Sequence, residues 1–221
     1  MSLKTVIFDV DGTIVRYKVG YGSSWDAIFY AAGLKKEQEK LLEYYLYKPE
    51  QYPTWFKELV KLLKGVSVSK IKKIVLPPEY SLGAKETCLK LKKMGYSVGI
   101  LSSCVDLIGD YIKDDLNLDF CRCSKVFIEN GYFTGEGEYL VHLWKKDEAL
   151  RDLCLELGIK PSETAYVGDH VSDIPVFKIA GFAIAYRSKD SQIKKNVDTT
   201  IFDLKKIPFL IDRRVDSGGF I

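Results

Sequence analysis

The sequence lacks any long apolar run and carries little net charge. Among its 221 residues no stretch of about 18 consecutive apolar residues occurs, so no transmembrane helix is predicted. The first residues, MSLK, lead directly into a strand pattern without the apolar segment of a signal peptide, and we therefore expect a cytoplasmic protein. The 33 Lys and Arg residues nearly balance the 30 Asp and Glu residues, giving a net charge of +3. Such a small excess predicts neither nucleic-acid nor membrane binding and leaves a small molecule as the expected partner.

Cysteine and histidine are also scarce. The five cysteines are odd in number and scattered, which suits a reducing compartment better than a disulfide framework. Cys104, Cys121 and Cys123 could form a metal-binding group, but their spacing matches no zinc pattern, so the interpretation as small buried apolar residues is favoured. Neither His142 nor His170 is assigned a metal role, because the ion predicted below prefers oxygen ligands.

The stretch TVIFDVDGT at residues 5–13 is the most informative part of the chain. Its apolar, β-branched start predicts a buried parallel strand, which ends at Asp9 and Asp11. Two carboxylates at this spacing leave the strand on the same side and repel each other, so a site that keeps both needs a shared proton or a cation. A hard ion with oxygen ligands, Mg²⁺, meets that need and commonly accompanies phosphate. The alternative is a solvated Asp-x-Asp-Gly turn.

Helices and strands alternate over most of the chain, which predicts an α/β fold with a doubly wound, Rossmann-like parallel sheet. Residues 18–78 are an exception, because they contain only short helical patterns. We therefore expect residues 1–17 and 79–221 to form the core and residues 18–78 to pack as a small helical cap inserted after the first strand. Further strands are predicted at 96–101, 164–167, 182–186 and 199–202, and an Asn-Gly turn predicts a hairpin over 125–137.

Three predicted parallel strands end in polar residues of complementary type. Asp9 and Asp11 follow the first strand, Ser102 the second, and Asp169 and Asp173 the third. Because the carboxyl ends of parallel strands share one edge of the sheet, these residues are expected to converge. Asp9, the first residue out of its strand, is the candidate nucleophile toward phosphorus. Asp11, with a raised pKa, is the candidate general acid and base.

The remaining candidates serve the metal and the phosphate. We expect Mg²⁺ to be held by Asp9, Asp169 and the backbone carbonyl of Asp11. Ser102 and the N–H that follows it, at Ser103, are candidates for binding phosphate oxygens.

A lysine near the start of the predicted helix over 145–157, Lys145 or Lys146, would stabilise the charge that develops on the phosphoryl group. Each lysine taken singly also fits a solvated position on a helix.

Taken together, these residues resemble the haloacid dehalogenase-like superfamily of phosphohydrolases. DVDGT at 9–13 matches the first motif, ILS at 100–102 the second, Lys146 the third, and GDHVSD at 168–173 the fourth. The resemblance covers nearly the whole chain. It implies that the helical insertion is a mobile cap, and that Asp173 supports the metal site from behind its ligands and pairs with Lys146.

Within the superfamily the chain looks most like phosphoserine phosphatase. That resemblance implies a cap glutamate and a cap arginine for the amino-acid head group, but the corresponding places fall near Ser23 and Leu59. Ser103 and Cys104 stand where the family usually has two glycines after the second-motif serine.

The resulting functional prediction is a Mg²⁺-dependent phosphomonoester hydrolase that acts on a small phosphorylated metabolite through an aspartyl-phosphate intermediate. A phosphomutase or phosphotransferase would use the same aspartyl-phosphate, and a non-enzymatic phosphoryl-accepting or binding protein is the alternative from another class. The helical cap favours an enzyme, because closing over a substrate to exclude water serves catalysis. The oligomeric state and the identity of the phosphate ester stay open.

Overall fold

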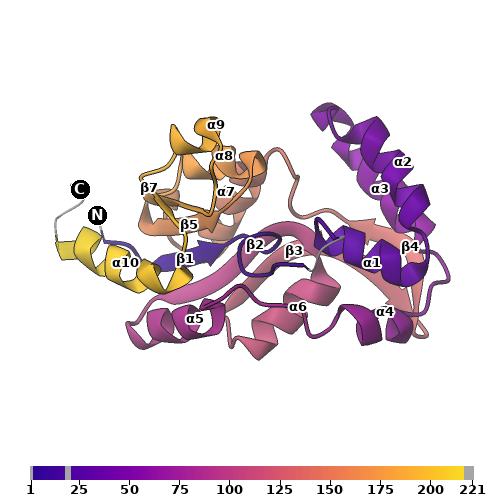
Figure 1. Cartoon of the computed structure of the whole chain (residues 1–221), viewed down its shortest axis with the longest axis horizontal. Helices are drawn as coiled ribbons and strands as arrows, with labels where there is room; N and C mark the ends of the chain where they lie inside the picture. The colour runs from indigo at the N-terminus through magenta and orange to yellow at the C-terminus, as the bar shows by residue number, and fades with distance from the viewer. Residues whose placement is uncertain (1, 18–20, 217–221) are drawn as a thin grey trace.

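The structure, a computed structural model, describes residues 2–17 and 21–216. One seven-stranded sheet runs through it (Figure 1). Its strands are β1 (Thr5–Phe8), β2 (Ser97–Val105), β3 (Phe120–Glu129), β4 (Tyr132–Glu138), β5 (Thr164–Gly168), β6 (Phe182–Tyr186) and β7 (Thr199–Ile201). They lie in the order β4-β3-β2-β1-β5-β6-β7, and only β4 pairs in the antiparallel direction. The predicted α/β fold with a mostly parallel sheet is confirmed.

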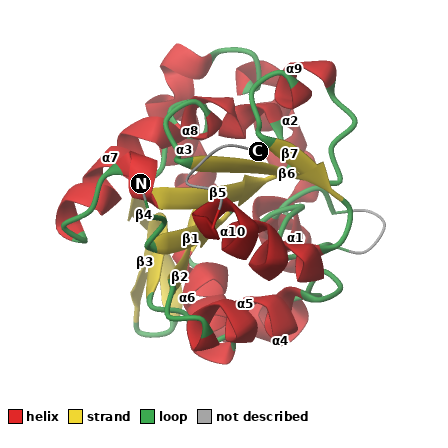
Figure 2. Ribbon diagram, turned by 90° about the vertical axis from the view of Figure 1, so that its left-hand side faces the viewer, coloured by secondary structure: helices red, strands yellow, loops and turns green. Residues whose placement is uncertain are grey.

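Helices cover both faces of the sheet, as a doubly wound fold requires. The helices are α1 (Ser24–Ala32), α2 (Lys35–Tyr45), α3 (Tyr52–Leu62), α4 (Val68–Val75), α5 (Ala84–Lys93), α6 (Asp106–Asp115), α7 (Lys146–Glu156), α8 (Ile174–Phe177), α9 (Ser191–Lys194) and α10 (Ile207–Asp216). Along β1 the side chains alternate between two apolar clusters. Val6 and Phe8 pack with α5, α6 and α10, whereas Ile7 packs with α7, α8 and α9 (Figure 2).

The helices α1 to α4 lie between β1 and β2 in sequence and gather at the β4 end of the sheet (Figure 1). Backbone hydrogen bonds join this insertion to the hairpin: Gly65 N–H donates to Phe133 O at 2.8 Å, and Val68 N–H donates to Gly131 O at 3.0 Å. Buried side chains of the insertion also continue the apolar cluster of the core. The insertion therefore shares its apolar core with the hairpin and the sheet. Residues 18–20, at the start of the predicted cap, lie outside the described residues.

The second strand extends further than the sequence predicts. A strand ending at Leu101 was expected, but β2 continues to Val105, with an irregularity between these two residues. Leu101 pairs with Arg122 and Val105 pairs with Ser124, so four residue steps on β2 match two on β3. This bulge holds the second-motif serines inside the strand. Their polarity was mistaken for the strand's end.

Residues 207–216 form α10, with Pro208 as the second residue of the helix. Proline is well tolerated in the first turn of a helix, where its missing N–H has no intrahelical partner. Buried Ile207 and Ile211 attach α10 to the sheet face. Among the described residues, no helix is long and apolar enough to cross a membrane.

Candidate active site

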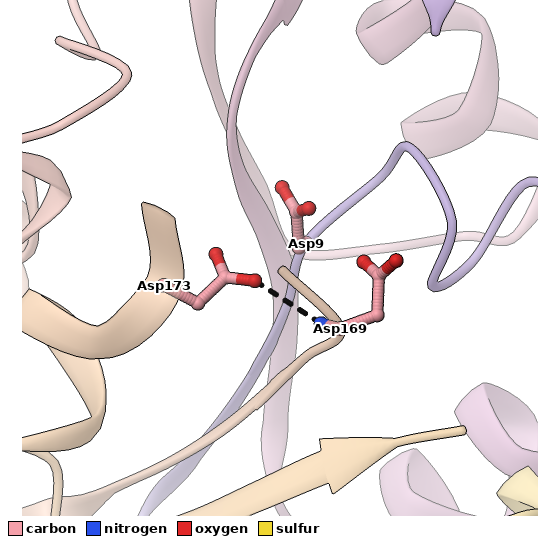
Figure 3. Close-up of side chains that lie close together, drawn as sticks. All are labelled: Asp9, Asp169 and Asp173. Carbon is pink, nitrogen blue, oxygen red and sulfur yellow. Dashed lines mark hydrogen bonds between the residues drawn. The ribbon is translucent and has the colours of Figure 1, made fainter. Parts of the chain in front are cut away.

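The predicted convergence at one edge of the sheet occurs. Asp9 directly follows β1, and Asp169 directly follows the neighbouring β5. Asp173 ends a short 3-10 turn that follows Asp169 (Figure 3). The Asp9 N–H donates to Val167 O of β5 at 2.8 Å, which extends the parallel pairing of β1 and β5 by one residue. Asp9 is only 4% exposed and Asp173 is fully buried, so both carboxylates are withdrawn from water.

Lys146 is the cation that compensates this burial. As the first residue of α7, it extends a side chain that is 2% exposed between two carboxylates. Its Nζ donates to Asp173 Oδ1 at 2.7 Å and to Asp9 Oδ1 at 3.0 Å. Burial alone would lower the lysine pKa, but the charges of Asp173 and Asp9 raise it, so the ammonium stays charged. Of the two candidate lysines, Lys146 faces the site, whereas Lys145 is largely exposed beside Glu148.

Asp173 is held by donors on both carboxylate oxygens. Oδ1 accepts from the Tyr166 hydroxyl at 2.9 Å in addition to Lys146, and Oδ2 accepts the backbone N–H groups of Asp169 and His170, each at 3.1 Å. These bonds fix the loop that carries Asp169, as the dashed contact in Figure 3 illustrates. Asp173 thus anchors the turn and orients Lys146, while the Asp169 side chain stays available.

The Asp169 carboxylate lies close to the turn after β1. Its Oδ1 accepts the Thr13 hydroxyl at 3.0 Å. Gly12 has φ +84°, and a Cβ built there would overlap the Asp169 carboxylate, so only glycine allows this approach. Burial, followed by the charges of Asp9 and Asp173, raises the pKa of Asp169 to about 8.

Asp11 occupies a different environment, between the core and the insertion. Its Oδ2 accepts the Ser24 hydroxyl of α1 at 2.8 Å, and its buried Oδ1 has no hydrogen-bond partner. Burial and the nearby Asp9 charge raise the pKa of Asp11 to about 6, against the lowering effect of Ser24. A carboxyl that titrates near neutrality can both give and take a proton.

The second-motif serines border the same space. Ser102 is 2% exposed, and its hydroxyl contacts Asp9. Burial raises the pKa of Asp9, and this hydrogen bond lowers it. The Ser102 Oγ also accepts the Cys104 N–H at 3.3 Å. The insertion reaches Ser103, where the Trp25 indole N–H donates to the carbonyl at 3.1 Å.

The residues present fit a hard divalent cation. Asp9, Asp169 and Asp173 each place one carboxylate oxygen so that all three atoms lie within 4.8 Å of one another. Burial, and after it the repulsion between neighbouring carboxylates, raises the pKa values of Asp9 and Asp169. A cation would relieve that repulsion, and oxygen is the donor that Mg²⁺ prefers. Because donors already surround both oxygens of Asp173, Asp9 and Asp169 are the more available ligands. The Asp11 carboxylate is outside this cluster, and its expected contact is through the backbone carbonyl.

Comparison with known proteins agrees with this geometry. The family model described as haloacid dehalogenase-like hydrolase matches residues 6–178. The chain belongs to the haloacid dehalogenase-like hydrolase family.

Named relatives of this hydrolase are phosphatases. A curated phosphoserine phosphatase from Methanocaldococcus jannaschii is 31% identical over 208 residues, which cover 92% of this chain and 95% of the relative. One from Archaeoglobus fulgidus is 29% identical over 188 residues, 85% of this chain and 53% of the relative, so the hydrolase spans about half of that protein. A solved structure described as a phospho-aspartyl intermediate analogue of phosphoserine phosphatase has a TM-score of 0.77, 29% identity, and coverage of 95% of this chain and 99% of that one. The predicted family and the predicted enzyme class, a phosphatase, are confirmed.

Three residues of the site were given no role by the sequence. Ser23 is the N-cap of α1 and accepts the Asp26 N–H at 3.2 Å, while the hydroxyl of the next residue, Ser24, donates to Asp11. Thr13 belongs to the first motif, a signal that could have identified it. Tyr166 lies in an apolar strand pattern, where nothing marks its hydroxyl as functional.

When metal is removed, we expect the free energy of unfolding of this hydrolase to fall as the pH rises. The pKa values of Asp11, about 6, and Asp169, about 8, lie above the ordinary value of 3.8, so the native state holds protons that the unfolded state has lost. Their stabilisation is complete below the ordinary pKa and disappears as pH rises through the folded value. Urea unfolding with a chelator should give a free energy of unfolding that declines by a few kcal/mol between about pH 5 and pH 8.

The Asp169→Asn variant is the control, because its amide does not ionise and its decline over the same range should be smaller. A wild-type stability that is flat or rises over this range would contradict the raised pKa values.

Proposed function

We propose that this protein is a Mg²⁺-dependent phosphomonoester hydrolase that acts on a small phosphorylated metabolite through an aspartyl-phosphate on Asp9. The proposal rests on the different environments of two neighbouring carboxylates, Asp9 and Asp11. Asp9 is held by a lysine that keeps its charge, whereas Asp11, two residues later, accepts the Ser24 hydroxyl and has a pKa of about 6. Pairs of titratable groups in such different environments commonly mark an acid–base pair of roles.

The proposed chemistry has two steps. In the first, an Asp9 carboxylate oxygen attacks phosphorus and forms the acyl-phosphate bond, while the phosphorus–oxygen bond to the leaving group breaks and protonated Asp11 gives its proton to that oxygen. In the second, ionised Asp11 accepts a proton from water as the water oxygen attacks phosphorus. Inorganic phosphate leaves, and the Asp9 carboxylate is restored.

Lys146 and Ser102 support the phosphoryl group in this proposal. The Lys146 ammonium, fixed by Asp173, stabilises negative charge that develops beside Asp9. The Ser102 hydroxyl and the Ser103 N–H are the proposed donors to phosphate oxygens.

Asp9, Asp169 and the backbone carbonyl of Asp11 would hold Mg²⁺, with Asp173 behind them. When bound, the ion supplies positive charge that offsets the repulsion between phosphate and carboxylates.

The insertion is proposed to act as a cap that must move for substrate to enter. Asp9 and Lys146 are almost fully buried, and Ser24 bonds directly to Asp11, so a bulky phosphate ester needs the α1 end of the cap to separate from the core. The chain leaves the core and returns to it at adjacent points, since Val15 pairs with Tyr80 and Arg16 N–H donates to Glu79 O at 2.9 Å. This supports cap boundaries at residues 18 and 78.

A substrate panel tests the proposal. Release of inorganic phosphate should be measured from O-phosphoserine, sugar phosphates, nucleoside monophosphates and p-nitrophenyl phosphate, with Mg²⁺ and with chelator. O-phosphoserine belongs in the panel because relatives carry its name. We expect release from at least one ester with Mg²⁺ and its loss with chelator. Transfer to an added alcohol without free phosphate would instead identify a phosphotransferase, and no turnover of any ester would contradict an enzyme of this kind.

Ser24 is predicted to set the pH dependence of turnover. Removing its hydroxyl in Ser24→Ala takes a hydrogen bond from the ionised form of Asp11, so the Asp11 pKa should rise from about 6. The limb of the pH–rate profile that reports this pKa should shift to higher pH by up to about one pH unit. Adjacent Ser23→Ala is the matched control. It removes the N-cap of α1 at about 1 kcal/mol of stability and should leave the profile in place. Equal profiles for all three proteins would refute the role of Ser24.

A further inference from the structure

Three of the five cysteines, distant in sequence, meet beside the second motif. The Sγ atoms of Cys104 and Cys123 are 3.2 Å apart, and those of Cys121 and Cys123 are 3.4 Å apart. We call these three residues the thiol cluster. All are free thiols, and Cys123 is the member in contact with both others. Two members, Cys104 and Cys123, are buried as the sequence interpretation expects, and the contacts between the sulfurs add a feature that it did not predict.

The surroundings of the thiol cluster differ along the chain of sulfurs. Cys121 is partly exposed, whereas Cys123 and Cys104 are buried at 3% and 0% exposure. Two of the sulfurs pack closely against Gly109 of α6, because a Cβ built there would lie only 2.6 Å from the Cys123 Sγ and 2.9 Å from the Cys121 Sγ. Cys121, the partly exposed member, is therefore where a small reagent meets the cluster.

Strand geometry determines which two cysteines of the thiol cluster can form a disulfide. Cys104 and Cys123 each stand one residue before a member of the Val105–Ser124 pair, on neighbouring parallel strands, and their Sγ atoms are 3.2 Å apart. Neighbouring strands are about 4.8 Å apart, inside the range of Cα separations that disulfides span. Cys121 and Cys123 are two residues apart on one extended strand, roughly 6.5 Å, at the upper limit of that range.

We propose that Cys104 and Cys123 form an intramolecular disulfide by exchange with a low-molecular-weight disulfide that reacts first at Cys121. The Cys121 sulfur attacks the reagent R–S–S–R, forms a mixed disulfide and releases one RSH. Cys123 then attacks the Cys121 sulfur and releases the second RSH, and Cys104 attacks Cys123, which returns Cys121 to a thiol. In total two cysteine thiols lose two electrons and two protons, and the reagent becomes two thiols.

The disulfide between Cys104 and Cys123 would shift the part of β2 that carries Ser102 of the proposed active site. Cys104 N–H donates to the Ser102 hydroxyl, and both residues belong to the bulge of β2 that lies against β3. Drawing the two sulfurs from 3.2 Å to a bonded distance of about 2.05 Å pulls this bulge toward β3. Displacement of a substrate-positioning group by about 1 Å can cost roughly 100-fold in rate. The oxidised protein should therefore be strongly and reversibly less active.

The test treats the intact, folded protein with oxidised glutathione and follows both thiol number and bridged peptides. Trypsin cleaves after Arg122, so Cys121 and Cys123 fall in separate peptides, 114–122 and 123–125, while Cys104 lies in 94–113. The expected result is loss of two of the five thiols and a bridge between peptides 94–113 and 123–125, both reversed by dithiothreitol. These readouts do not depend on turnover, so they stand or fall separately from the proposed phosphatase activity.

Two variants and two internal references sharpen the result. Cys121→Ser should slow formation of the bridge severalfold while leaving activity of the reduced protein unchanged, and Cys123→Ser should abolish the bridge. Cys88 and Cys154 are also buried, but among the described residues neither has a sulfur–sulfur contact with another thiol, so they should react last. A stable mixed disulfide at Cys121 with no bridge, a final bridge between Cys121 and Cys123, or equal reactivity of Cys88 and Cys154 would overturn the proposal.

Discussion

Replacing Asp9 by asparagine is expected to reduce phosphate release by roughly 10⁴-fold or more, because the amide offers no carboxylate to form the acyl phosphate. The variant should remain folded. Burial already disfavours the charged form of Asp9, and Lys146 retains its 2.7 Å contact with Asp173 when the charge at residue 9 is removed. The measurement is steady-state phosphate release with Mg²⁺, accompanied by urea unfolding of the same sample.

Asp114→Asn is the matched control for the chemistry of this substitution. Its side chain is 82% exposed and remote in sequence from the four motifs, so activity should match the wild type. If Asp9→Asn kept a tenth or more of wild-type activity while folded, Asp9 would not be the nucleophile.

The second large effect is expected at Lys146, and it concerns stability as well as activity. Lys146→Met keeps the length of the side chain but leaves Asp9 and Asp173 buried without their shared cation. Breaking a buried pair in this way costs about 3–5 kcal/mol of the free energy of unfolding. Activity should fall too, because the ammonium no longer stabilises charge beside Asp9. Urea unfolding near neutral pH measures the first effect and phosphate release the second.

The neighbouring residue provides the control. Lys145 has a side chain 58% exposed, and its ammonium pairs with the exposed Glu148 at 3.3 Å, so Lys145→Met should change stability by less than about 0.5 kcal/mol. The paired substitutions separate a buried lysine from a solvated one on the same turn. Similar stabilities for both variants would contradict the compensating role of Lys146.

The sequence predicts the catalytic edge well because that edge depends on local patterns. Each of the two strand ends can be predicted from a few residues: one apolar run ends at Asp9, and another ends just before Asp169. The parallel sheet then places these two ends side by side. The positions of Lys146 and Asp173 come from motif spacing through the family resemblance. Their mutual contact at 2.7 Å agrees with the pairing which that resemblance implies.

Contacts that depend on packing between distant elements were not predictable. Whether Ser23 or Ser24 faces Asp11 is decided by one residue of helix phase at the start of α1, below the precision of a pattern. The bulge of β2 arises from its pairing with β3, and the same pairing brings Cys104 to Cys123. The register of β2 against β3 cannot be predicted from local composition or periodicity.

The most direct test of the account is to look for the phosphoryl group on Asp9 during turnover. Protein mixed with a substrate from the panel and Mg²⁺ should be quenched in acid within a few turnovers, digested, and measured by mass spectrometry. The account predicts a gain of one phosphoryl group on the peptide that contains Asp9, sensitive to hydroxylamine and absent from Asp9→Asn. Turnover with no phosphorylated Asp9 peptide at any quench time, or with the phosphoryl group on another residue, would contradict it.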